Sequence, residues 1–171
     1  MRVLMFPEDE MRLRRKAEDL PSDAFNTEPI RQLAEVLAAT LEGIDNVDVL
    51  ASTQLAFDPP WALLALKGPK GISILCNPRV RTHSGESFEL GACASFAGVP
   101  ERLLCPMRLT VEFRRLDGML REQECGASGA RAVWQGIDSL RGKLFSDRMS
   151  PIAQKPGFFQ KVRRQRTMGR T

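Results

Sequence analysis

Few residues of this chain are of types that do acid, base or metal chemistry near neutral pH. The 171 residues include a single histidine, His83, which excludes any site needing two or more histidine ligands, such as a histidine-rich zinc site. The four cysteines, Cys76, Cys93, Cys105 and Cys125, contain no C-x-x-C pair. The simplest interpretation of that spacing is free thiols in a reducing compartment, not a disulfide scaffold.

The net charge of +4 is concentrated at the carboxyl end. Residues 155–171 hold six basic residues and no acidic one, whereas residues 1–154 hold 19 basic and 21 acidic residues. The six are Lys155, Lys161, Arg163, Arg164, Arg166 and Arg170. Such a segment indicates an acidic partner, and its excess of Arg over Lys favours bidentate contacts to phosphate. We therefore predict a folded domain over 1–154 and a basic C-terminal tail over 155–171.

The overall composition is that of a globular protein with a core. Apolar residues make up 43% of the chain and charged residues 27%, and no apolar run approaches the roughly 18 residues of a membrane-spanning helix. The first twenty residues contain five acidic side chains and no secretory apolar core. This composition excludes disorder over most of the chain and a membrane-spanning helix. The acidic first twenty residues argue against secretion.

Two helices are predicted from local signals. Thr27 with Pro29 marks the start of the first helix, apolar residues follow at spacings of three and four, and Gly43 ends it. Ser128 is predicted to cap a second helix over residues 129–140, with an apolar stripe that indicates a central position.

The region between the helices has a different pattern. Short apolar runs over residues 47–124 are interrupted by Pro, Gly and Asp, with turn signals at 67–71 and 116–118. These runs predict antiparallel strands. Strands between two helices favour an α+β fold.

Four segments carry a resemblance to a known family. Residues 142–151 match a terminal G-x-L-F-x-D-R-L-S-P motif, and 47–54, 91–95 and 134–139 stand where three further motifs would be. In these features the chain resembles peptide deformylase over about residues 2–154. That family comprises metalloenzymes that remove the N-formyl group from new proteins. The resemblance implies antiparallel sheets around a central helix.

The same alignment implies altered site residues. The family's metal is held by one Cys and two His, and these positions are Cys93, Gln135 and Ser139 here. The position of the catalytic Glu is Gly136, whereas Gln54, which helps to bind the formyl oxygen in the family, is retained. One thiol, one amide and one hydroxyl do not make a transition-metal site, and glycine cannot move a proton. We therefore expect no catalytic residues, no metal and no cofactor.

Further expectations concern the surroundings of that site. Val47 and Val49 replace two glycines of the family motif and are expected to narrow the crevice. Gln54 and Gln135 are expected to face each other and to hydrogen-bond. His83 is expected to lie away from the second helix.

Two expectations concern the C-terminal part of the chain. Asp147 and Arg148 predict a structural ion pair. Phe158 and Phe159 are expected to anchor the basic tail, either on the domain or on a partner.

The leading functional prediction is a protein that is not an enzyme and that acts at the ribosome in a structural or assembly role. Its tail would contact ribosomal RNA phosphates, with ribosomal or assembly proteins as further partners and no membrane or small-molecule substrate. The location would be a bacterial cytoplasm or a mitochondrial matrix. Two alternatives stay open: a metal-free hydrolase that uses Cys93, and a regulatory partner that reads formyl-methionyl nascent chains.

Overall fold

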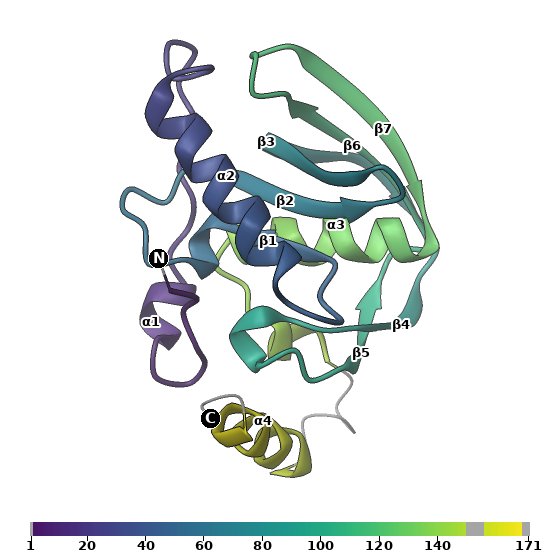
Figure 1. The fold of residues 1–171 in the computed structure, drawn as a ribbon. Coiled ribbons are helices and arrows are strands. Elements are labelled where there is room, and N and C mark those ends of the chain that lie inside the picture. Colours follow the sequence, from purple (N-terminus) through teal and green to yellow (C-terminus); the bar gives the residue numbers. More distant parts are fainter. Residues whose placement is uncertain (1, 150–155, 169–171) are drawn as a thin grey trace.

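The computed structural model describes residues 2–149 and 156–168, and its strands form two antiparallel sheets (Figure 1). The larger sheet has the order β1-β2-β3-β6-β7 and the smaller sheet pairs β4 with β5. The strands are β1 (Val49–Ala51), β2 (Leu63–Gly68), β3 (Gly71–Ser84), β4 (Ser87–Gly91), β5 (Glu101–Cys105), β6 (Arg108–Arg114) and β7 (Leu120–Gly126).

Four α-helices accompany the sheets in the described part of the chain. They are α1 (Glu10–Leu13), α2 (Glu28–Glu42), α3 (Ala127–Leu140) and α4 (Pro156–Met168). None of them is long and apolar enough to span a bilayer. The predicted α+β architecture, with antiparallel sheets around a central helix, is confirmed.

Helix α2 follows the local signals closely. Thr27 is its N-cap, Pro29 lies in the first turn and Gly43 is the C-cap. The Thr27 hydroxyl donates to the Ala24 carbonyl at 2.7 Å instead of capping the helix. The apolar side chains of α2 pack against one face of the larger sheet in a cluster that includes Leu50. Alternation along the strands therefore leaves the opposite face of the sheet for α3.

Helix α3 lies on that opposite face and also reaches the smaller sheet (Figure 1). It begins at Ala127 with Gly126 as N-cap, so Ser128 lies inside the first turn and is not the cap that the sequence predicted. The reason is the pairing of the preceding strand, because Gly126 is still opposite Arg108 and the Ala127 amide donates to the Met107 carbonyl at 2.8 Å. Strand β7 thus runs directly into α3.

Helix α4 packs on the domain through its aromatic side chains. Phe158 is buried, with its ring centroid 6.1 Å from that of Phe96 and 6.3 Å from that of Phe145. Val162, one turn further along, is buried in the same cluster. Of the two anchoring alternatives, the structure shows the one in which the segment folds back on its own domain.

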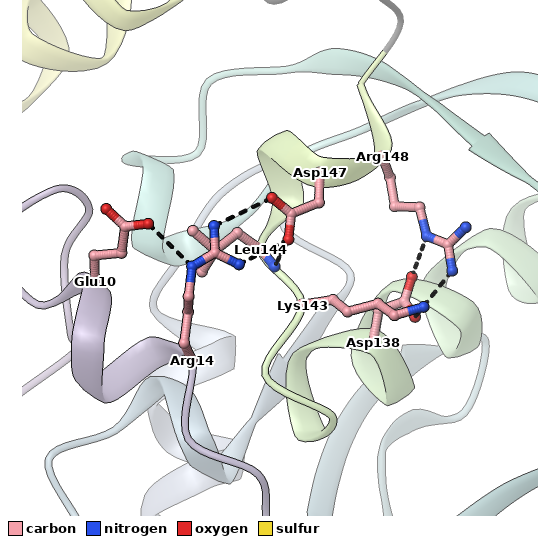
Figure 2. A network of polar contacts seen from close by, with 7 residues as sticks. All are labelled: Glu10, Arg14, Asp138, Lys143, Leu144, Asp147 and Arg148. Atoms are coloured by element: carbon pink, nitrogen blue, oxygen red, sulfur yellow. Dashed lines mark hydrogen bonds and ion pairs between the residues drawn. The ribbon is translucent and has the colours of Figure 1, made fainter.

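A polar network ties the N-terminal segment to α3 (Figure 2). Asp147 accepts from Arg14 Nη1 at 3.0 Å, and Arg14 also bonds Glu10. Arg148 Nε donates to the buried carboxylate of Asp138 at 2.6 Å. The predicted pair between Asp147 and Arg148 is therefore wrong. Consecutive side chains of a 3₁₀ turn point about 120° apart, so each residue finds a separate partner.

Gly142 allows the chain after α3 to meet the N-terminal segment. Its φ is +73°, and a Cβ there would lie 2.2 Å from the carbonyl oxygen of Arg14. We expect Gly142→Ala to lower the free energy of unfolding in urea by about 2–4 kcal/mol, because of the backbone conformation and the clash.

The control is Gly157→Ala in α4, where a Cβ would meet no atom within 4 Å. That variant should keep or slightly raise stability, by up to about 1 kcal/mol. Equal stability of the Gly142 variant and the wild type would show that Arg14 is not held against this turn.

Candidate functional site

The retained family residues meet in the interior where three elements converge. Gln54 ends the turn after β1, and Cys93 follows β4. The Gln54 amide nitrogen donates to Cys93 Sγ at 3.2 Å and to Ser95 Oγ at 3.1 Å, and its oxygen accepts from the Ala51 amide at 2.9 Å. Ala51, Gln54, Cys93 and Ser95 are all buried. The polar groups of this cluster therefore hydrogen-bond to one another without water.

Gln135 approaches the same region from α3 but bonds elsewhere. Its amide nitrogen donates to the Ala92 carbonyl at 2.8 Å, and its oxygen accepts from Arg131 at 3.3 Å. The expected hydrogen bond between Gln54 and Gln135 is therefore wrong. Each buried amide finds a closer partner on its own side of the site.

Ser139 is turned toward the helix backbone. Its hydroxyl donates to the Gln135 carbonyl one turn earlier, at 3.1 Å. The Ser139 carbonyl in turn accepts from Thr53 Oγ1 at 3.0 Å. The cavity between Gln54, Cys93 and Ser139 measures only about 10 Å³, which is at or below the size needed for one water molecule.

This donor set does not fit the family's metal. Transition metals in proteins are held by thiolates, imidazoles and carboxylates, whereas Gln135 and Ser139 offer neutral groups that already have protein partners. Among residues 2–149 and 156–168, no group of three or more His, Cys, Asp or Glu side chains is placed to hold a metal ion.

Two substitutions relative to the family pattern compensate each other in volume. Position 136 has glycine in place of a glutamate, and position 49 has valine in place of a glycine. A Cβ on Gly136 would lie 2.8 Å from Val49 Cγ2 and 2.9 Å from Leu64 Cδ1. The strand thus carries the volume that the resemblance assigns to a glutamate on the helix. Val49 packs in the core cluster with α3, and Val47 packs in the cluster beneath α2, so neither lines the small cavity at Gln54 and Cys93.

A buried arginine that the sequence analysis missed crosses the site. The Arg131 side chain is only 4% exposed and forms an ion pair with Asp48, just before β1. Its guanidinium lies against Gly91, where a Cβ would come within 2.8 Å of Nη1. With Gln135, it links the larger sheet to the smaller one. One feature of the sequence could have revealed this arginine. It lies four residues before Gln135, on the buried face of α3, where an apolar residue is usual.

The environment of Cys93 disfavours a nucleophilic role. Burial raises the pKa of the Cys93 thiol to about 11, although hydrogen bonds from the Ser95 and Phe96 amides and the Gln54 side chain act in the opposite direction. A reactive thiolate needs a lowered pKa and a basic neighbour.

The single histidine lies on a neighbouring part of the molecule. The His83 ring packs edge-on against Trp134 of α3, with centroids 5.1 Å apart. The expectation that His83 lies away from this helix is wrong, because the 14 residues of β3 carry its end across to α3.

The predicted basic residues divide into three groups. Lys161, Arg163 and Arg164 are exposed on α4 and form no ion pair with any described residue. Arg166 is half-buried and pairs with Glu8 at 2.6 Å. Lys155 and Arg170 lie outside the described residues.

Comparison with known proteins identifies the family. The sequence model described as polypeptide deformylase matches residues 1–155. The chain belongs to the polypeptide deformylase family.

Individual relatives agree with this membership. A peptide deformylase of Alkalilimnicola ehrlichii is 31% identical over 157 residues, covering 90% of this chain and 84% of that protein. Peptide deformylase 2 of Nitrosomonas europaea is 25% identical over 155 residues, covering 90% and 80%. The crystal structure of peptide deformylase from Ehrlichia chaffeensis matches the fold with a TM-score of 0.83 at 18% identity, covering 99% of this chain and 98% of that one.

The family corrects one prediction. The expectation that this chain is not an enzyme is wrong, because its deformylase relatives are named for an enzymatic activity. The prediction rested on three altered motif positions. Those positions bear on one metal-dependent mechanism and do not exclude every activity.

The volume exchange at Gly136 is testable by a double-mutant cycle. We expect Gly136→Ala to lower the free energy of unfolding by about 1–3 kcal/mol, because its methyl group overlaps Val49 and Leu64. In a Val49→Ala background the same change should cost at least about 1 kcal/mol less, a coupling typical of residues in contact.

Gly129→Ala on the same helix is the control. Its Cβ would meet only the Cys125 Cβ, at an ordinary 3.7 Å, and we expect no loss of stability. Additive effects of the substitutions at 49 and 136 would contradict the close contact.

The raised pKa of Cys93 predicts slow alkylation. From an ordinary value of 9.0 to about 11, the thiolate fraction at pH 7.5 falls about 100-fold, and burial slows access further. Iodoacetamide labelling of native protein, followed by mass spectrometry of the Cys93 peptide, should be at least that much slower than labelling in urea. Rapid native labelling would instead favour the metal-free hydrolase.

Proposed function

We propose that this deformylase-family protein works at the ribosome, where the exposed basic face of α4 binds ribosomal RNA. The observation that carries the proposal is the division of charge on this helix. Lys161, Arg163 and Arg164 face solvent without an ion-pair partner among the described residues, whereas Arg166 is neutralised by Glu8. Three exposed cations on one docked helix, without carboxylate partners in the part of the chain that the structure describes, form a surface suited to phosphate groups.

The order of α4 strengthens this interpretation. Phe158 and Val162 fix the inner face of the helix in the core, so the outer cations are held on a rigid element. A preorganised basic face loses less conformational entropy on binding than a disordered tail would. Burial of the apolar face therefore supports binding by the polar face.

The proposed cellular location follows from the proposed binding of ribosomal RNA. Ribosomal RNA, with ribosomal or assembly proteins around it, places the protein in a bacterial cytoplasm or a mitochondrial matrix. New chains at the ribosome would then lie close to the deformylase-like domain. The alternative role as a reader of formyl-methionyl chains needs an open pocket, and the interior cavity of about 10 Å³ disfavours it.

Sedimentation on a ribosome gradient tests the proposal. We expect the wild-type chain to co-migrate with a ribosomal particle at low salt and to leave it as salt rises, because binding depends on counterion release. The triple variant Lys161→Gln, Arg163→Gln, Arg164→Gln should remain at the top of the gradient.

A matched variant controls for net charge. Lys70→Gln, Arg108→Gln and Arg121→Gln together remove the same charge from exposed positions around the larger sheet and should still co-migrate. A free wild-type protein, or a triple α4 variant that co-migrates fully, would overturn the proposal. Formyl-methionyl peptides recovered with the protein would favour the reader instead.

A further inference from the structure

An apolar groove lies beside the basic face of α4. It runs between α4 and the N-terminal segment and has a volume of about 450 Å³, within the range of ligand sites. Its lining residues are Phe6, Pro7, Phe159, Gln160, Val162 and Arg163. The groove therefore joins an apolar surface to Arg163, one of the exposed cations of α4.

Two neighbouring aromatic rings, called here the wall rings, line this groove. The ring centroids of Phe6 and Phe159 are 5.8 Å apart, with an interplanar angle of 39°. Phe6 is supported from below by Phe96, whose ring is nearly parallel at 4.8 Å, and Phe159 is supported edge-on by Phe158. Both wall rings are half-buried, so each is held in place while part of its surface stays accessible.

The charged side chain among the residues that line the groove is a cation. Arg163 lines the groove without an ion-pair partner among the described residues. Among the described residues, the carboxylate that pairs with α4 belongs to Glu8, and Arg166 neutralises it. Arg166 also donates to the Phe6 carbonyl at 3.3 Å, which fixes the wall opposite α4.

We propose that this groove takes an unstacked base of single-stranded RNA. The base would stack on the accessible face of Phe159 beside Phe6, and Arg163 would contact the adjoining phosphate. The proposal rests on the proposed function, because it assigns a base-binding pocket to the same RNA-binding surface. It distinguishes single-stranded or bulged RNA from duplex RNA, whose bases are stacked inside the helix and unavailable.

The chemistry favours a base over an apolar peptide side chain. A base offers a flat π surface to the aromatic lining of the groove and carries a phosphate within reach of a neighbouring cation. An apolar peptide side chain would fill the groove but would leave Arg163 without an anion. The cationic rim therefore decides between the two occupants.

Fluorescence anisotropy with the full chain tests this pocket. The probes are a labelled 12-nucleotide single-stranded RNA and a blunt RNA duplex of the same length. We expect Phe159→Leu to weaken single-strand binding by about 5- to 100-fold, the range for loss of one stacked base. Duplex binding should change less than about twofold, because the basic face is intact.

Three further variants sharpen the result. Phe159→Trp should restore single-strand binding, because it returns an aromatic surface. Phe88→Leu, a matched change of an exposed phenylalanine on β4, should have no effect. Arg163→Gln should weaken both probes and reduce the slope of log affinity against log salt by about 0.7 to 0.9.

The outcomes separate this inference from the proposed function. If Phe159→Leu leaves single-strand binding unchanged while the triple variant of α4 abolishes it, the base pocket is wrong and RNA binding stands. Equal losses on both probes would show that Phe159 only holds α4 in place, which also overturns the pocket. If neither probe binds the wild-type chain, both proposals fail.

Discussion

Helix α3 can lie directly on β1 and β2 because residue 136 has no side chain. Any Cβ at that position would overlap Val49 and Leu64. This close approach determines how far α3 lies from each of the two sheets. It therefore also determines which segments the side chains next to Gly136 on α3 can contact. Gln135 reaches the backbone after β4, and Arg131 reaches the loop before β1. One missing side chain thus determines how the interior is bridged.

The bridged interior is a set of satisfied polar groups. Burying amides, a thiol and a guanidinium is costly unless each has a partner, and here Gln54, Gln135 and Arg131 all have one. Such a network ties the sheets together and leaves almost no free volume. The surface of α4 is different, because its cations are exposed and its neighbouring groove is open. The contrast between a closed interior and an open helix face underlies both proposals.

Local signals predicted α2, α3 and the strands, but they predicted neither α1 nor α4 and not the partners of individual side chains. The limits of α2, the turns and the α+β class follow from caps, spacing and turn residues. The separate partners of Asp147 and Arg148, and the position of His83 against Trp134, depend on segments far away in the chain. The position of Arg131 on α3 indicated an unusual buried residue, but its partner Asp48 could not be predicted because it is 83 residues away. The altered motif positions likewise bear on one metal-dependent mechanism only. To conclude from them that the whole protein is not an enzyme was an error.

The contact between α4 and the start of the chain also constrains how the protein is made. Glu8 and Arg166 are 158 residues apart in sequence, so the N-terminal segment has to wait for the last helix before it can complete its packing. During synthesis the rings of Phe6 and Phe96 lack the aromatic cover that α4 later provides. A nascent chain with uncovered apolar rings is prone to aggregation and is a natural client for chaperones. The packing of the N-terminal segment is therefore completed only after α4 has been synthesised.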